Sequence, residues 1–239
     1  MTRTNVVLLA IFTVCSLLPV QAQEAAPDSA TQLLNQGRTT QDQATLSAAR
    51  DAFKKLIEDH PNQEQYWYLL ARTDAYRCQA YEAQGDKKKA EHALDEAIRN
   101  VQEALTINDN SADAHSLLAD LYGEKIGFGM AMFAGPRYGP KVQQENQRAL
   151  AIDAHNPRVY ASLGREYLEA PKTFGGDLDK AIESFRKSTE LDPKSDETFV
   201  WLAIALRKKG DQAGAQQALQ QALTLNPQSA FARQAAAKK

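Results

Sequence analysis

Apolar residues recur along this chain with the spacing of α-helices. Between residues 196 and 229 they form two stripes, separated by Gly210-Asp211. The stripes consist of Phe199, Leu202, Ala203 and Leu206 before the break, and Ala215, Leu219 and Ala222 after it. Positions three and four apart share one face of a helix. The pattern predicts two helices joined by a tight turn, and Pro227 cannot continue the second helix. We find no alternating run typical of a strand, so an all-α fold is expected.

The same pattern returns along the chain in units of about 34 residues. Five units are predicted, over residues 30–63, 64–111, 112–156, 157–195 and 196–229. Residues 23–29 are expected to be a linker and residues 230–239 a capping helix. Small residues at the eighth and twentieth positions of a unit, such as Ala203 and Ala215, would let its two helices approach closely.

The unit resembles the tetratricopeptide repeat (TPR), a pair of antiparallel helices. The resemblance implies a right-handed α-solenoid with one continuous core, in which successive units contact only their neighbours. It also implies a protein that binds other proteins or peptides. In this family, helix A positions 2, 5, 6, 9 and 12 tend to face the inner, concave groove.

The three middle units exceed the usual length, and the excess falls between their two helices. In 64–111 we expect about two extra turns on each helix. In 112–156 the excess is the glycine-rich stretch 123–141, expected as a loop, and in 157–195 it lies around residues 170–177. Turns on one side of a stack line up, so the excesses should enlarge the same edge.

Apolar side chains in these stretches define a candidate binding site, which we call the loop edge. Its members are Phe128, Met130, Met132, Phe133, Tyr138 and Phe174. Methionine and aromatic side chains suit adaptable apolar contacts. Two interpretations stay open: these residues pack the loops onto the solenoid, or they line a pocket, lid or docking surface.

A second candidate site is the concave groove. Its members are Arg38, Tyr68, Arg72, Arg158, Arg165, Trp201 and Arg207. A row of arginines would suit carboxylates or an extended acidic peptide. Alternatively, Asp113 and Asp120 interrupt the row and pair with it. The lysine–asparagine clamp of cytosolic relatives is not reproduced, since only Asn35 matches an asparagine position.

A narrower resemblance comes from residues 125–140, 156–164 and 170–193, with a proline followed by a Gly-Gly-Asp turn at Pro171 to Asp177. These stretches are similar to secreted bacterial repeat proteins, in particular the periplasmic T-component partners of TRAP-type transporters. That resemblance implies association with a solute-binding protein and handling of apolar ligands.

The first 22 residues predict a secretory signal peptide. Arg3 precedes an apolar run from Val6 to Leu18, Pro19 follows, and Val20-Gln21-Ala22 supplies small residues for cleavage after Ala22. The run is too short to span a bilayer comfortably. We therefore expect a periplasmic or secreted protein with no stable membrane span after cleavage.

Composition narrows the function further. The net charge of −2 lacks the basic excess of nucleic-acid binders. Two cysteines cannot form a disulfide framework or a four-ligand zinc site. After cleavage Cys78 alone remains, and two interpretations stay open for it: a buried side chain, or a thiol that is reactive or bridged to another molecule. The four histidines occupy unlike repeat positions, and His115 falls on a core stripe. No catalytic residue, metal site or cofactor is predicted.

Three functions remain in competition. The first is a non-enzymatic interaction or scaffold protein of the periplasm or cell envelope, with a protein or peptide partner. The second is a transport-accessory or carrier protein that binds an apolar small molecule at the loop edge. The third is an enzyme, which would need a perturbed titratable cluster that the sequence does not show. The open ends of a stack leave self-association as an option.

Overall fold

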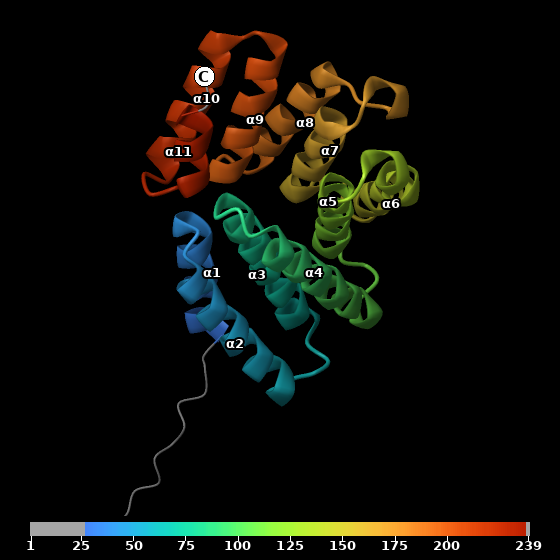
Figure 1. Ribbon diagram of the computed structural model, residues 1–239, viewed down its shortest axis with the longest axis vertical. Coiled ribbons are helices and arrows are strands. Elements are labelled where there is room, and N and C mark those ends of the chain that lie inside the picture. Colours follow the sequence, from blue (N-terminus) through green and yellow to red (C-terminus); the bar gives the residue numbers. More distant parts are fainter. Residues whose placement is uncertain (1–26, 238–239) are drawn as a thin grey trace, which may run out of the picture.

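The computed structural model describes residues 27–237, and within them the chain forms α-helices and one short 3₁₀ turn (Figure 1). The signal-peptide prediction and residues 23–26 of the expected linker lie outside this range. The helices are α1 (Pro27–Thr40), α2 (Gln43–Asp59), α3 (Glu64–Ala83), α4 (Lys87–Ile107), α5 (Ala112–Phe128), α6 (Ala131–Ile152), α7 (Pro157–Glu169), α8 (Leu178–Leu191), α9 (Asp196–Lys209), α10 (Gln212–Leu225) and α11 (Ala230–Ala237); the 3₁₀ turn is Lys172–Phe174.

Consecutive helices pack as antiparallel hairpins, and the odd-numbered helices α1 to α11 contact one another in succession. The resulting architecture is an α-solenoid of helix pairs, as the sequence pattern predicts. Residues 27–29, expected as linker, already belong to α1.

Side-chain caps start most helices. Asp42, Asp86, Ser111, Asp177 and Asp211 each accept a hydrogen bond from a backbone N–H in the first turn of the following helix. Such caps satisfy donors that the helix itself leaves unpaired. Turns between hairpin helices are therefore short and fixed, which places successive helix ends along common edges.

Close helix packing depends on the small residues of the repeat. A Cβ added to Gly164 of α7 would lie 2.5 Å from the Phe185 ring of α8. A Cβ on Gly37 would lie 2.7 Å from Leu46 of α2. Phe185 and Leu46 are fully buried, so neither side chain has solvent space into which it can retreat.

The extra length of the middle units is helical in two of the three cases. Helices α3 and α4 have 20 and 21 residues, in line with the two extra turns expected. The prediction of a loop over 123–141 is wrong, because α5 and α6 continue through it and only Gly129-Met130 separates them. Residues 170–177 form a true loop, which Gly175 closes with φ of +93°.

Buried polar groups tie the first two units together. Asp74 of α3 is fully buried and accepts hydrogen bonds from Arg50 Nε at 2.9 Å, Arg77 Nη1 at 2.6 Å and Asn100 Nδ2 at 2.8 Å. Its partners come from α2, α3 and α4, so one carboxylate joins three helices. Cys78 is a free, fully buried thiol on α3, and burial raises its pKa.

The curvature of the stack brings its two ends together. Helix α11 contacts α1, and Figure 1 shows them side by side although they lie at opposite ends of the described chain. Two hydrogen bonds span this junction: Asn226 Nδ2 donates to Thr39 Oγ1 at 3.2 Å, and Gln234 Nε2 donates to Gln41 Oε1 at 2.7 Å. The odd-numbered helices therefore curve into a nearly closed ring.

Candidate functional site

The predicted groove arginines have partners within the chain, and the contact of Arg38 joins the two ends of the nearly closed ring. Arg38 of α1 donates from Nη1 to Asp196 Oδ1 of α9 at 2.9 Å and lies 3.7 Å from Glu197 Oε1. Tyr76 of α3 donates from its hydroxyl to Glu197 Oε2 at 3.0 Å. The first and last units thus meet through a charged contact, which we call the end-to-end contact.

Arg72 lies in the same region between two tyrosines. Its guanidinium carbon is 5.8 Å from the ring centres of both Tyr68 and Tyr76, and Nη2 donates to the Tyr76 hydroxyl at 3.2 Å. Cation–π contact of this kind stabilises a guanidinium that is shielded from water. Arg72 therefore holds the Tyr68 ring in place on one side.

Arg165 is bonded to Asp120 by two hydrogen bonds, one of them from Nε to Oδ1 at 2.9 Å. The same guanidinium lies 5.8 Å from the Trp201 ring centre. Trp201 also packs against Phe185 and Phe231, so it belongs to the C-terminal core. Arg207 donates to the Ala235 carbonyl oxygen at 2.9 Å. Five predicted groove residues therefore have structural contacts within the chain: Arg38, Arg72, Arg165, Trp201 and Arg207.

Arg158 differs, because its side chain is 47% exposed and stands beside an open pocket. Its Nε lies 3.2 Å from Asp113 Oδ2. The pocket has a volume of about 460 Å³, within the range of ordinary ligand sites. Its lining residues come from the start of α3, the turn before α5 with the first residues of α5, and the end of α6 with the turn before α7: Glu64, Gln65, Tyr68, Asn108, Asn110, Ser111, Ala112, Asp113, Ile152, Asp153 and Asn156.

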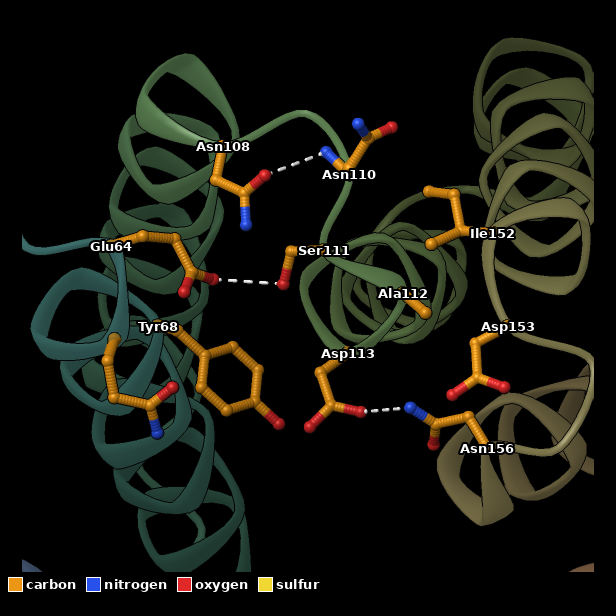
Figure 2. Close-up of a pocket in the computed structure, with 11 residues that line it drawn as sticks. Glu64, Tyr68, Asn108, Asn110, Ser111, Ala112, Asp113, Ile152, Asp153 and Asn156 are labelled. Atoms are coloured by element: carbon orange, nitrogen blue, oxygen red, sulfur yellow. Dashed lines mark hydrogen bonds between the residues drawn. The ribbon is translucent and has the colours of Figure 1, made fainter.

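The N-terminal ends of α3, α5 and α7 build this pocket (Figure 2). Ser111 caps α5 by accepting from Ala114 N and donates its own proton to Glu64 Oε1 at 2.9 Å. Asn156 caps α7 and donates from Nδ2 to Asp113 Oδ1 at 2.7 Å. These cross-links fix the walls, so the pocket is formed before any ligand binds.

Tyr68 forms one side of the pocket. The residue is only 4% exposed, and no hydrogen bond joins its hydroxyl to any residue of the described range 27–237. Figure 2 shows the hydroxyl directed across the pocket toward Asp113. Burial, partly offset by Arg72 and Arg158, raises the pKa of Tyr68 to about 12, so the hydroxyl keeps its proton at neutral pH.

Tyr68 of the lining and the neighbouring Arg158 were predicted as site residues, and Asp113 as a pairing partner, whereas the other polar residues of the pocket were not predicted. They lie in the turns Asn108–Ser111 and Asp153–Asn156, which occupy equivalent places between successive units. Turns between units line up along one side of a stack, just as the turns within units do. Capping residues at such equivalent turns were the signal that could have located the pocket.

The loop edge divides into separate groups. Phe128 and Tyr138 pack against the core, where Tyr138 stacks on Tyr122 with ring centres 5.8 Å apart. Met130, Met132 and Phe133 are 68 to 76% exposed at the α5–α6 tip.

Phe174 lies on the other exposed part of the loop edge and is 68% exposed. It adjoins Gly175, which packs beside Gln143 of α6. Gln143 is eleven residues from Met132 along the helix, roughly 16 Å. The two exposed groups therefore form no single surface.

Two further groups on the inner helices are titratable. Burial, with Asp120 and Glu82 nearby, raises the pKa of Glu124 to about 8, and its Oε2 has no hydrogen-bond partner among residues 27–237. His115 is buried, with Nδ1 2.6 Å from Glu145 Oε2 and Nε2 3.0 Å from the Asp109 carbonyl oxygen. Within the described range, no three His, Cys, Asp or Glu residues gather as a metal site, and no helix there combines the length and hydrophobicity of a membrane span.

The helix-pair stack and its inner surface place the chain in the class of TPR-type α-solenoids. Residues 174–230 match the family model described as tetratricopeptide repeat. The solved structure of TTC0263, a thermophilic TPR protein from Thermus thermophilus, is similar in fold, with a TM-score of 0.63 and 18% identity over 87% of this chain and 97% of that one.

Two further solved structures are less similar to this chain, with TM-scores near 0.4. YrrB, described as a TPR protein with an unusual peptide-binding site, is 17% identical over 87% of this chain and 91% of its own, with a TM-score of 0.42. MamA from Desulfovibrio magneticus RS-1 is 16% identical over 84% of this chain and 96% of its own, with a TM-score of 0.41. No curated protein matches the chain in sequence.

Proposed function

We propose that this protein is a non-enzymatic interaction protein that binds a segment of a partner protein on its inner surface, at the pocket between the starts of α3, α5 and α7. The TPR-type fold supports binding of a protein or peptide. We place the site at the pocket and not along the arginine row, because Arg38 and Arg165 form ion pairs within the chain, in line with the interpretation that the arginines pair locally.

The observation that carries the proposal is the Tyr68 hydroxyl. The Tyr68 side chain is buried, yet its hydroxyl is not enclosed by protein and has no hydrogen-bond partner among residues 27–237. This hydroxyl instead faces a pocket that already has fixed walls. Exposed amide side chains, Gln65 and Asn110, border the pocket and can bond an extended backbone.

A capture experiment with pocket-filling variants tests the proposal. Gln65→Trp and Asn110→Trp together place bulky neutral side chains at the pocket mouth without disturbing the core. We expect the chain from residue 23 onward to capture a stoichiometric partner from an envelope extract, and the double variant to lose it. The matched control is Met132→Asp with Phe174→Asp, which should retain the partner. Loss only in the control would move the binding site to the loop edge.

We also propose a periplasmic or cell-envelope location. The support is the arrangement of Arg3, the apolar run to Leu18 and the small residues before position 23. Fusion of residues 1–30 to alkaline phosphatase, which is active only after export, should give activity, and the exported chain should begin at Gln23. An inactive fusion with a stable, uncleaved product would contradict this location.

A further inference from the structure

We propose that the pocket between the starts of α3, α5 and α7 binds a cationic side chain, a lysine or an arginine, of the partner segment. This inference rests on the proposed function and names the chemistry of its partner. The proposed partner group is cationic, whereas the arginine row of the predicted groove would select an acidic partner. The pocket has the opposite charge.

The lining carries three carboxylates, those of Glu64, Asp113 and Asp153, and no cationic residue. Arg158 pairs with Asp113 from outside the lining. Neither Glu64 nor Asp153 forms an ion pair with any residue between 27 and 237: Glu64 accepts from Ser111, and Asp153 accepts from the backbone N–H of His155. Two carboxylates therefore remain uncompensated around one cavity.

Helix N-termini ordinarily favour anions, because their unpaired N–H groups carry partial positive charge. Here one first-turn donor of α5 and one of α7 are already used, since Ser111 accepts from Ala114 N and Asn156 accepts from Arg158 N, whereas α3 has no side-chain cap. Each helix end contributes about half a charge, whereas each carboxylate contributes a full one. Arg158 offsets Asp113, and Arg72 stands at the ring of Tyr68, so the charges left in the lining for a bound side chain to meet are the carboxylates of Glu64 and Asp153.

The third argument is the geometry around Tyr68. Its neutral hydroxyl has free lone pairs, and it stands in the same pocket as the carboxylates of Glu64 and Asp153 (Figure 2). An ammonium offers three donors and a guanidinium five, and neither can accept. Figure 2 shows Glu64 and Asp153 on opposite sides of the pocket, so a cationic side chain that donates to the hydroxyl would lie between two carboxylates without an ion pair, which a neutral or anionic side chain could not compensate.

The test is an NMR titration of the isotopically labelled chain from residue 23 onward, which contains every described helix. The probes are Nα-acetyl-lysine methylamide, Nα-acetyl-arginine methylamide and the uncharged isostere Nα-acetyl-norleucine methylamide. We expect saturable amide shifts in residues 64–68, 108–113 and 152–156 with the cationic probes, with Kd in the millimolar range, ~1–10 mM, and binding of norleucine at least tenfold weaker. Comparison of the two cationic probes decides between lysine and arginine.

Variants of the pocket residues test whether the cationic probes bind there. Tyr68→Phe removes only the hydroxyl and should weaken lysine binding about three- to tenfold. Glu64→Gln with Asp153→Asn should abolish it, whereas Met132→Ala at the exposed tip should leave it unchanged. Equal binding of lysine and norleucine, binding of Nα-acetyl-glutamate in their place, or the absence of saturable shifts would overturn the inference.

The outcomes separate this inference from the proposed function. A partner that is lost from the Gln65→Trp and Asn110→Trp double variant, but retained by Glu64→Gln with Asp153→Asn, would leave the function standing and remove the cationic anchor. Selective lysine or arginine binding without any captured partner would support the pocket chemistry and contradict the proposed function.

Discussion

At the scale of single residues, a few side chains determine how closely the helices approach. The small residue at the eighth position of each unit lies where the two helices of the unit meet. Gly164 is the tightest case, with the Phe185 ring directly over its Cα. Gly123, Gly127, Gly135 and Gly139, by contrast, have nothing within 4 Å of an added Cβ and impose no such demand.

Gly164→Ala should lower the free energy of unfolding by about 1–3 kcal/mol, because the new methyl group overlaps the Phe185 ring in a closely packed core. Urea denaturation followed by circular dichroism measures the change. Gly123→Ala on α5 is the matched control, since nothing lies within 4 Å of the added Cβ. Alanine is the better helix former, so the control should be neutral or more stable by roughly 0.5–1 kcal/mol.

Glu124 makes stability depend on pH. Burial raises its pKa from 4.5 to about 8, so the folded chain holds this proton more tightly than the unfolded chain. The resulting stabilisation is complete below about pH 4.5 and is lost as the pH rises through about 8. Glu124→Gln keeps a neutral side chain at every pH.

We therefore expect the stability advantage of Glu124→Gln over the parent chain to grow between pH 5 and pH 9. Thermal denaturation at several pH values measures it. Glu183→Gln, an exposed carboxyl on α8, should show no such trend. A constant difference between Glu124→Gln and the parent chain would show that Glu124 is ionised in the folded state throughout.

At the scale of elements, the helices could be predicted from the sequence and their ends less well. The apolar stripes placed the helix pairs, and the length of unit 64–111 predicted the longer α3 and α4. The glycines of 123–141 suggested a loop, yet α5 and α6 run through them. Four of the five, Gly123, Gly127, Gly135 and Gly139, have open space where a Cβ would lie, so their neighbours impose no turn there.

Asp74 shows how elements depend on one buried charge. Asp74→Ala would leave Arg50 and Arg77 without their shared carboxylate between α2, α3 and α4. Breaking a buried ion pair costs about 3–5 kcal/mol, so this variant should unfold at clearly lower urea concentration. Asp179→Ala, which removes an exposed pair with Lys209, should cost at most about 1 kcal/mol. Similar losses in the two variants would contradict the structural role of Asp74.

At the scale of the whole molecule, the ring closure could not be predicted from repeat spacing. Small rotations between neighbouring units add up along the stack, and the pattern of one unit does not contain their sum. The closure engages Arg38 in the end-to-end contact, whereas Arg165 pairs with Asp120 of the preceding unit, one of the two interpretations of the arginine row that the sequence left open. It left the pocket open, and the pocket lies at turns that the repeat pattern treats as connectors.

Arg38→Ala with Glu197→Gln should open the ring. The variant loses the bonds from Arg38 and weakens the contact with Tyr76, at a cost of about 1–3 kcal/mol for hydrogen bonds to charged groups. Small-angle X-ray scattering should show a larger radius of gyration with unchanged helix content. Lys187→Ala, which removes an exposed pair within α8, is the control and should leave the radius unchanged. An unchanged radius in the double variant would mean that the remaining contacts of α1 with α11 suffice.

The central claim is that a partner binds at the pocket between the starts of α3, α5 and α7, and site-specific photo-crosslinking in the producing cell tests it most directly. A photoreactive phenylalanine analogue would replace Gln65 or Asn110 at the pocket mouth in one pair of strains, and Met132 at the α5–α6 tip in another. We predict one discrete crosslinked partner from positions 65 and 110 and none from position 132. Crosslinks from position 132 alone would contradict the claim and assign binding to the exposed tip.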